Sequence, residues 1–137
     1  MYQNNWGGTQ PGCLIVLRDQ SDSMNDPFGG TQVGDRQKKS EAVALVINSF
    51  LDALVKTNTL VHNDGSTSVR PRADIAVIGY GGQTVASVFG GDLEGRDFVS
   101  FADLQAQHPT VVGRSARTGP ATFVDACRTP PSQPARR

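Results

Sequence analysis

The first apolar run of the chain is short and continuous. Residues 13–17 read Cys-Leu-Ile-Val-Leu, with Pro11 and Gly12 before them and a loop at 25–34 that is rich in Gly, Pro, Asn and Asp. A continuous run of this length is typical of a strand that is buried on both faces, and such strands usually lie in parallel sheets between helices. The pattern therefore predicts a central strand over residues 13–18.

In the next segment, apolar residues recur at the three- and four-residue spacing of one helical face. The spacing predicts a helix over about 35–56, with Asp35 as its N-terminal cap and Lys56 suited to its negatively polarised C-terminal end. We expect its buried face to consist of the apolar residues that follow this spacing: Val43, Val46, Ile47, Phe50, Leu51 and Leu54.

Two further apolar runs lie at residues 74–80 and 84–89, and a short glycine-rich gap separates them. A gap of this kind predicts a hairpin, so the two strands should be antiparallel neighbours. The residues that join the helix to the first of these runs form a polar connection, and the pattern allows a short helix at 101–107. The order of strand, helix, strand and strand predicts an α/β fold with a mostly parallel sheet.

The composition is that of a soluble globular domain, since 37% of the 137 residues are hydrophobic and the formal net charge is zero. A chain without net charge has no overall field that would hold nucleic acid or an anionic membrane. No apolar run approaches the roughly 20 residues that span a bilayer, and the first residues lack the pattern of a secretory signal. Two cysteines are too few for a disulfide framework, so we expect a cytoplasmic protein.

Three oxygen-bearing side chains follow the first predicted strand at alternate positions: Asp19, Ser21 and Ser23. In an open α/β sheet, ligands bind at the carboxyl ends of the strands, which is where these residues lie. One carboxylate and two hydroxyls form an all-oxygen ligand set that suits Mg²⁺ or Mn²⁺ and is poor for Zn²⁺. The alternative is an ordinary turn, in which Asp and Ser side chains bond nearby backbone amides.

Four segments follow one another in a characteristic order between about residues 12 and 91: "VLRDQSDSM", "KKSEAVALVINSFLDAL", "RADIAVIGYGG" and "TVASVFGG". Together they resemble the opening of the von Willebrand factor type A family, with its first strand, metal loop, first helix and strand pair. The resemblance implies a doubly wound α/β fold with flanking helices and a metal-ion-dependent adhesion site. It further implies that Asp19, Ser21 and Ser23 bind Mg²⁺ or Mn²⁺, and that a protein partner offers an acidic residue to the ion.

The family completes this site with a threonine from a later loop and an aspartate from a loop later still. The segment "GPATFVDAC" is similar to the threonine loop, which makes Thr122 a candidate fourth ligand and Thr118 a weaker one, but no segment corresponds to the late aspartate. We therefore expect a domain that is truncated after its first half. Its parts would be an N-terminal arm over 1–12, a partial domain over 13–109 and a disordered Arg/Pro-rich tail over 110–137.

These features predict a protein-interaction module rather than an enzyme. One alternative is an incomplete domain without metal binding, whose open strand edge would favour self-association. A metal-assisted hydrolase is the second alternative, and it is disfavoured because no general base is evident. His62 and His108 stand alone in polar segments, so we expect them at the surface. Arg18 precedes the predicted ligands in a buried strand, where it needs a carboxylate partner or an exit to solvent.

Overall fold

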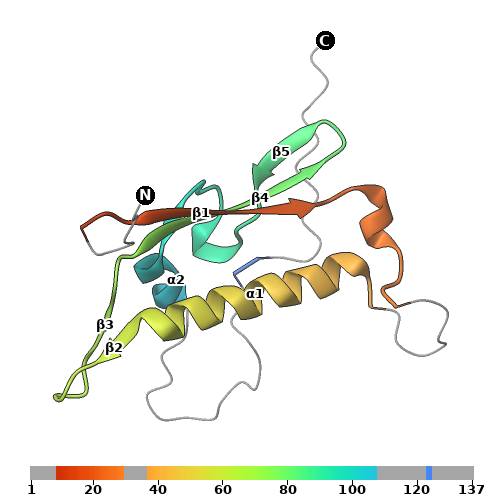
Figure 1. Ribbon diagram of the computed structural model, residues 1–137. Coiled ribbons are helices and arrows are strands. Elements are labelled where there is room, and N and C mark those ends of the chain that lie inside the picture. Colours follow the sequence, from red (N-terminus) through yellow and green to blue (C-terminus); the bar gives the residue numbers. More distant parts are fainter. Residues whose placement is uncertain (1–8, 30–36, 108–122, 125–137) are drawn as a thin grey trace, which may run out of the picture.

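The computed structural model describes residues 9–29, 37–107 and 123–124, and these residues form a mixed α/β fold (Figure 1). A four-stranded sheet contains β1 (Gly12–Asp19), β4 (Ala73–Gly81), β5 (Thr84–Ser87) and β6 (Val99–Ser100). The helices are α1 (Lys39–Asn58) and α2 (Phe101–Gln107), and a separate hairpin consists of β2 (Thr59–Val61) and β3 (Thr67–Val69). The 3-10 turns are η1 (Asp22–Asn25) and η2 (Gly91–Leu93).

The sheet is built around β4. β1 pairs with β4 in parallel over its whole length, from Gly12 opposite Ala73 to Asp19 opposite Tyr80. β5 and β6 both pair with β4 in the antiparallel sense, and because β1 occupies one edge of β4, they share the other edge. The α/β class is therefore confirmed. The prediction of a mostly parallel sheet is wrong, because the sheet that the described residues form has one parallel pair.

β1 is an edge strand within the described part of the chain, and only one of its faces is covered. Leu14 and Val16 pack against the core, whereas Ile15 and Leu17 are 50% and 66% exposed. Figure 1 shows both helices on the same side of the sheet. The prediction of a central strand buried on both faces is therefore wrong. A continuous apolar run indicates a strand, but it does not reveal whether a second layer covers the far face.

The start of α1 differs from the prediction. The helix begins at Lys39 with Lys38 as its N-cap, so the predicted cap Asp35, which lies outside the described residues, is the wrong residue. The backbone N–H of Lys38 donates to Glu41 Oε2 at 3.2 Å, which satisfies one of the amide groups at the helix start. The C-terminal end is as expected, since Lys56 lies in the last turn.

The buried face of α1 is rotated from the predicted one. Ile47 and Leu51 are buried as predicted, but Val46 and Phe50 are 68% and 44% exposed. The residues that α1 buries are Ser40, Ala44, Ile47, Asn48, Leu51, Asp52, Val55 and Asn58. Four of these eight are polar, and a pattern that counts only apolar residues therefore points to a neighbouring face.

The other predicted elements are confirmed, with one omission. β4 and β5 form the expected antiparallel hairpin, although β5 ends at Ser87, two residues before the predicted end. The short helix occupies 101–107. The polar connection before β4 contains the β2–β3 hairpin, in which Thr59 pairs with Val69. Its strands are short and mostly exposed, so hydrophobic periodicity gave no signal for them.

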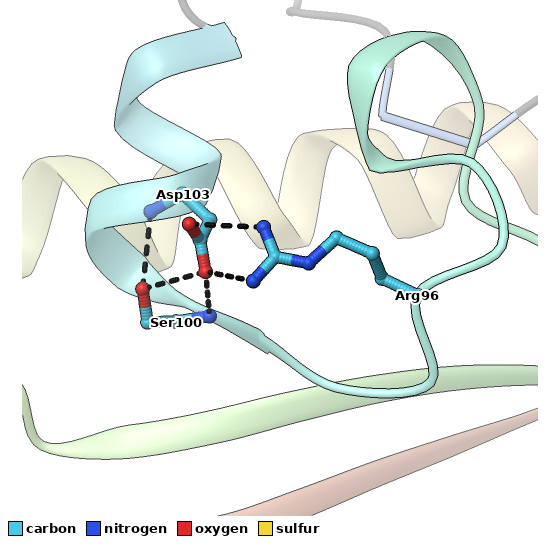
Figure 2. Close-up of polar contacts among 3 residues, drawn as sticks. All are labelled: Arg96, Ser100 and Asp103. Carbon is cyan, nitrogen blue, oxygen red and sulfur yellow. Dashed lines mark hydrogen bonds and ion pairs between the residues drawn. The ribbon is translucent and has the colours of Figure 1, made fainter.

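A reciprocal capping box begins α2 (Figure 2). The backbone N–H and Oγ of Ser100 donate to Asp103 Oδ2 at 2.8 and 2.9 Å, and the Asp103 N–H donates to Ser100 Oγ at 3.1 Å. Arg96 adds an ion pair, with its Nη1 3.0 Å from Asp103 Oδ1. The hydrogen bond from the Ser100 N–H, together with that from Arg96, lowers the pKa of the Asp103 carboxyl from its ordinary value of 3.8.

Asp103→Asn is expected to lower the stability near pH 7 by about 1 kcal/mol, as for other lost helix caps. Because the pKa of Asp103 is lowered in the folded protein, its charge stabilises the fold above pH 3.8 and this contribution is lost as the pH falls through the lowered pKa. The difference in Tm between wild type and variant should therefore shrink in acid. Thermal unfolding at several pH values measures it, with the exposed Asp97→Asn as control. A difference that stays constant down to about pH 2 would contradict the expectation.

One segment far along the chain packs into the core. Phe123 and Val124 are each 1% exposed, and Val124 forms a β-bridge with Phe89. From the other side, the buried side chain of Asn48 on α1 bonds the backbone of both residues. The prediction of a disordered tail over 110–137 is therefore wrong at these two positions, and the rest of that range lies outside the described residues.

Candidate metal site at the end of β1

Asp19 lies where β1 leaves the sheet. The N–H of the following residue, Gln20, donates to the Tyr80 carbonyl at 2.7 Å, so the ladder with β4 continues just past Asp19. The chain then turns into η1, with Ser21 as its N-cap and a hydrogen bond of 2.9 Å from the Met24 N–H to the Ser21 carbonyl. A strand therefore positions the carboxylate, and a tight turn positions the hydroxyls.

The three predicted first-loop ligands lie together in this turn. Asp19 Oδ1 accepts a hydrogen bond from the Ser21 N–H at 2.8 Å, and Ser21 Oγ lies 3.1 Å from Ser23 Oγ. The first of these contacts is the Asx turn that the ordinary-turn alternative also requires. The second is a hydrogen bond between two hydroxyls at an exposed position. The turn thus brings a carboxylate and two hydroxyls to one place on the surface.

The spacing of the two hydroxyls suits a small octahedral cation. Mg²⁺ binds oxygen at about 2.0–2.1 Å, so neighbouring ligands in an octahedron lie about 3 Å apart. The 3.1 Å between Ser21 Oγ and Ser23 Oγ fits this separation. The Ser21 N–H fixes one oxygen of Asp19, so the carboxylate is held at the turn before any ion arrives. The residues present therefore fit a Mg²⁺ or Mn²⁺ ion with several waters retained.

Asp26, at the end of the turn, contacts the start of α1. Asp26 lies 3.7 Å from Lys39 Nζ, which ties the end of η1 to the start of α1, and its carbonyl accepts the Lys39 N–H at 3.0 Å. No group of three or more His, Cys, Asp or Glu side chains that could hold a metal occurs in residues 9–29, 37–107 and 123–124. A cation at Asp19 would therefore depend on hydroxyl and water oxygens for its remaining ligands.

The candidates from the later loop, Thr122 and Thr118, lie outside the described residues. The described residue that follows Thr122 is Phe123, whose N–H donates to Asn48 Oδ1 at 2.7 Å in the core. The role of Thr122 as a fourth ligand stays a prediction. The role of Asn48 could not be predicted, because nothing in the local pattern distinguishes a polar residue that anchors a distant segment.

Gly81, near the end of β4, allows that strand to approach the turn closely. A Cβ atom at Gly81 would lie 2.7 Å from the carbonyl carbon and oxygen of Gln20, and 3.1 Å from the Ser21 nitrogen. These are backbone atoms that no rotamer change can move, so only glycine fits there. From the sequence alone, this glycine belongs to the short gap between two predicted strands. Its contact with Gln20 joins residues that are far apart in sequence, and it is visible only once β1 and β4 are paired.

Arg18 connects β1 to α1 directly beside the candidate site. Its side chain is 2% exposed, and Nη2 donates to the Ser40 carbonyl at 3.4 Å. The guanidinium therefore does not exit to solvent, which was one of the two predicted alternatives. The side chain extends to the first turn of α1, on the covered side of the sheet.

The histidine that the structure describes, His62, does not lie in the Asp19 turn. His62 is exposed in the β2–β3 hairpin, where its Nε2 lies 2.8 Å from Ser68 Oγ, and its predicted surface position is confirmed. His108 lies outside the described residues.

Comparisons with known proteins add no assignment. No family model, curated protein or solved structure shows a significant match to the chain. The described fold supports a mixed α/β architecture, and the likeness to the von Willebrand factor type A family depends on the motifs quoted above. Among the described helices, none is both long and apolar enough to cross a bilayer.

Proposed function

We propose that this chain is a protein-interaction module that holds Mg²⁺ or Mn²⁺ at Asp19, Ser21 and Ser23 and binds an acidic side chain of a partner through the ion. The observation that supports it most directly lies at the end of β1. There the Ser21 N–H orients the Asp19 carboxylate, and the hydroxyl oxygens of Ser21 and Ser23 lie 3.1 Å apart. These residues match the first-loop ligands that the resemblance to the von Willebrand factor type A family implies. Thr122 would be a further ligand.

The charge of the donor set favours adhesion over catalysis. One carboxylate neutralises half of the charge of a divalent cation, and neutral hydroxyls and waters leave the ion electrophilic. An anionic oxygen from another molecule then gains more from binding than water does. A hydrolase would also need a group that activates water. In the described part of the chain, the one histidine, His62, lies in the β2–β3 hairpin rather than at the Asp19 turn.

Asp19→Asn is the substitution that separates a ligand role from a turn role. Asparagine retains an oxygen that can accept the Ser21 N–H, so the turn should survive, but the only formal charge among the three ligands is lost. Wild type should gain about 1.4 kcal/mol of stability when Mg²⁺ is at about ten times its Kd. The variant should gain almost nothing. Thermal unfolding with and without Mg²⁺ measures both.

The neighbouring carboxylate provides the control. Asp22→Asn removes the same charge from η1, one residue before Ser23, and should leave most of the Mg²⁺ response intact. An equal response in wild type and Asp19→Asn, or no response in the wild type, would overturn the proposed site. The partner class is tested with the same proteins: a peptide containing Glu should bind the Mg²⁺-loaded wild type better than its Gln counterpart, and a chelator should abolish the difference.

A domain that binds no metal and completes its sheet with another chain is the second candidate. The observation that favours it is the exposed β1, where Ile15 and Leu17 face solvent. It predicts that Mg²⁺ does not stabilise the wild type, so the metal titration above separates the two candidates.

A further inference from the structure

The outer edge of β1 presents backbone groups that β4 does not use. The Gly12 N–H donates to the Arg72 carbonyl and the Gln20 N–H donates to the Tyr80 carbonyl, each at 2.7 Å. Because alternate residues of a strand turn their backbone groups to alternate edges, the even-numbered residues between them face β4. The N–H and C=O groups of Cys13, Ile15 and Leu17 therefore point to the opposite edge, where no strand of the described residues pairs with them.

The side chains of the same residues are apolar and exposed. Cys13 is a free, exposed cysteine, and Ile15 and Leu17 are 50% and 66% exposed on the face away from α1. Residues 13–17 contain no charged residue and no proline, which are two of the usual protections against strand addition. The pairing with β4 runs without a bulge from Gly12 to Asp19. This combination is a template for an added strand.

We propose that a second copy of this chain supplies the added strand, by antiparallel pairing of β1 with β1 about a two-fold axis at Ile15. In this register Ile15 meets Ile15 of the second copy, and Cys13 meets Leu17 of the second copy. All of these residues turn their backbone groups outward, so they form the hydrogen-bonded pairs of an antiparallel ladder. Opposed residues share a face, so their exposed side chains merge into one apolar band.

Charge and symmetry favour a second copy of this chain over a strand from a different protein. The apolar run is the same in length and character on both sides of Ile15, as a self-complementary two-fold interface requires. The register places the charged Asp19 opposite Pro11 of the second copy, beyond the apolar pairs. Moving the axis to Leu17 would bring Asp19 opposite Ile15 and leave fewer apolar pairs. With a formal net charge of zero, two copies also meet without long-range repulsion.

Ile15→Lys tests the interface in the full chain. Two lysines would meet at the axis, and we expect the dimer to weaken at least about tenfold, because like charges directly opposed across a ladder repel. Val85→Lys is the matched control: Val85 is 73% exposed and lies on β5, away from the β1 edge. Sedimentation over a range of concentrations, repeated with a chelator, should show a wild-type dimer that does not depend on divalent cations. The outcome therefore does not depend on the proposed metal site.

Disulfide trapping fixes the register. In a background of Cys13→Ser and Cys127→Ser, Ile15→Cys should form a covalent dimer, because paired residues in a ladder have Cα atoms about 5.5 Å apart. Leu17→Cys should not, since the two copies of residue 17 would lie about 14 Å apart. Trapping of Leu17→Cys but not of Ile15→Cys would overturn the proposed axis.

Amide hydrogen exchange tests whether the outer edge of β1 becomes covered when the dimer forms. Leu14 and Val16 face β4 and should be protected at all concentrations, whereas Ile15 and Leu17 should gain protection only as the dimer forms. A monomer in which Ile15 and Leu17 exchange rapidly at every concentration would overturn the proposal. A monomer in which they are already protected would also overturn it, because another segment of the same chain would then cover the edge. Association that Ile15→Lys leaves unchanged would place the interface elsewhere.

Discussion

Asn48→Leu is expected to destabilise the protein by about 3–5 kcal/mol, since it removes three buried hydrogen bonds at once. Asn48 Oδ1 accepts the N–H groups of Phe123 and Val124 at 2.7 and 2.9 Å, and Nδ2 donates to the Val124 carbonyl at 3.0 Å. Leucine preserves the volume but leaves these backbone groups without their partner in the core, where each costs about 1–3 kcal/mol. A loss of this size is a large fraction of the stability of a small domain.

Two further variants separate the hydrogen bonds from the packing. Asn48→Asp keeps an acceptor for both N–H groups but loses the donor to the Val124 carbonyl, so it should lower the stability less than Asn48→Leu does. This loss of stability should decrease in acid, where the protonated carboxyl can donate a hydrogen bond. Ser49→Ala changes the adjacent, exposed residue of α1 and should have little effect. Urea unfolding measures all three. A loss below about 1 kcal/mol for Asn48→Leu would mean that Phe123 and Val124 are not held as described.

The same residue shows where prediction from the sequence ends. The helix is evident from its apolar spacing, but the spacing favours a face with Val46 and Phe50, which are 68% and 44% exposed. The helix turns Asn48 inward instead, because two N–H groups of a segment about 75 residues later need an acceptor there. Local periodicity records which residues are apolar. It cannot record a polar contact that exists only after distant segments meet.

β1 illustrates a second limit. Its five apolar residues predicted the strand and its position correctly, since local propensity and turn signals define where a strand begins and ends. They did not predict its surroundings. Leu14 and Val16 contact the core, while Ile15 and Leu17 face solvent, because α1 and α2 cover one side of the sheet. The number of layers around a strand depends on the whole fold.

The candidate site likewise has a part that the sequence predicts and a part that it does not. Asp19, Ser21 and Ser23 lie within five residues of one another, so the turn that joins them could be anticipated from the motif, and the contacts at 2.8 and 3.1 Å agree with it. The close approach of Gly81 to the Gln20 backbone could not be anticipated. It requires the parallel register of β1 and β4, which no local pattern encodes.

Gly81→Ala should therefore damage the candidate site without touching any of its ligands. The added methyl group would lie 2.7 Å from the backbone carbonyl of Gln20, and relief requires either a shift of the turn or a separation of β1 from β4 at this end. Overpacking of this kind typically costs about 1–3 kcal/mol. Because Ser21 follows Gln20 directly, a shift of the turn would also change the spacing between Ser21 Oγ and Ser23 Oγ.

Gly65→Ala is the matched control for this effect. Gly65 has a φ of 81°, with no atom within 4 Å of an added Cβ, so alanine there costs only backbone strain of about 1 kcal/mol in the β2–β3 turn. If the proposed site is correct, both variants lose stability, but only Gly81→Ala also loses the stabilisation by Mg²⁺. If Mg²⁺ stabilised Gly81→Ala as much as the wild type, then Mg²⁺ binding would not depend on the geometry of the Asp19 turn. Such a result would contradict the site even if the loss of stability were as large as expected.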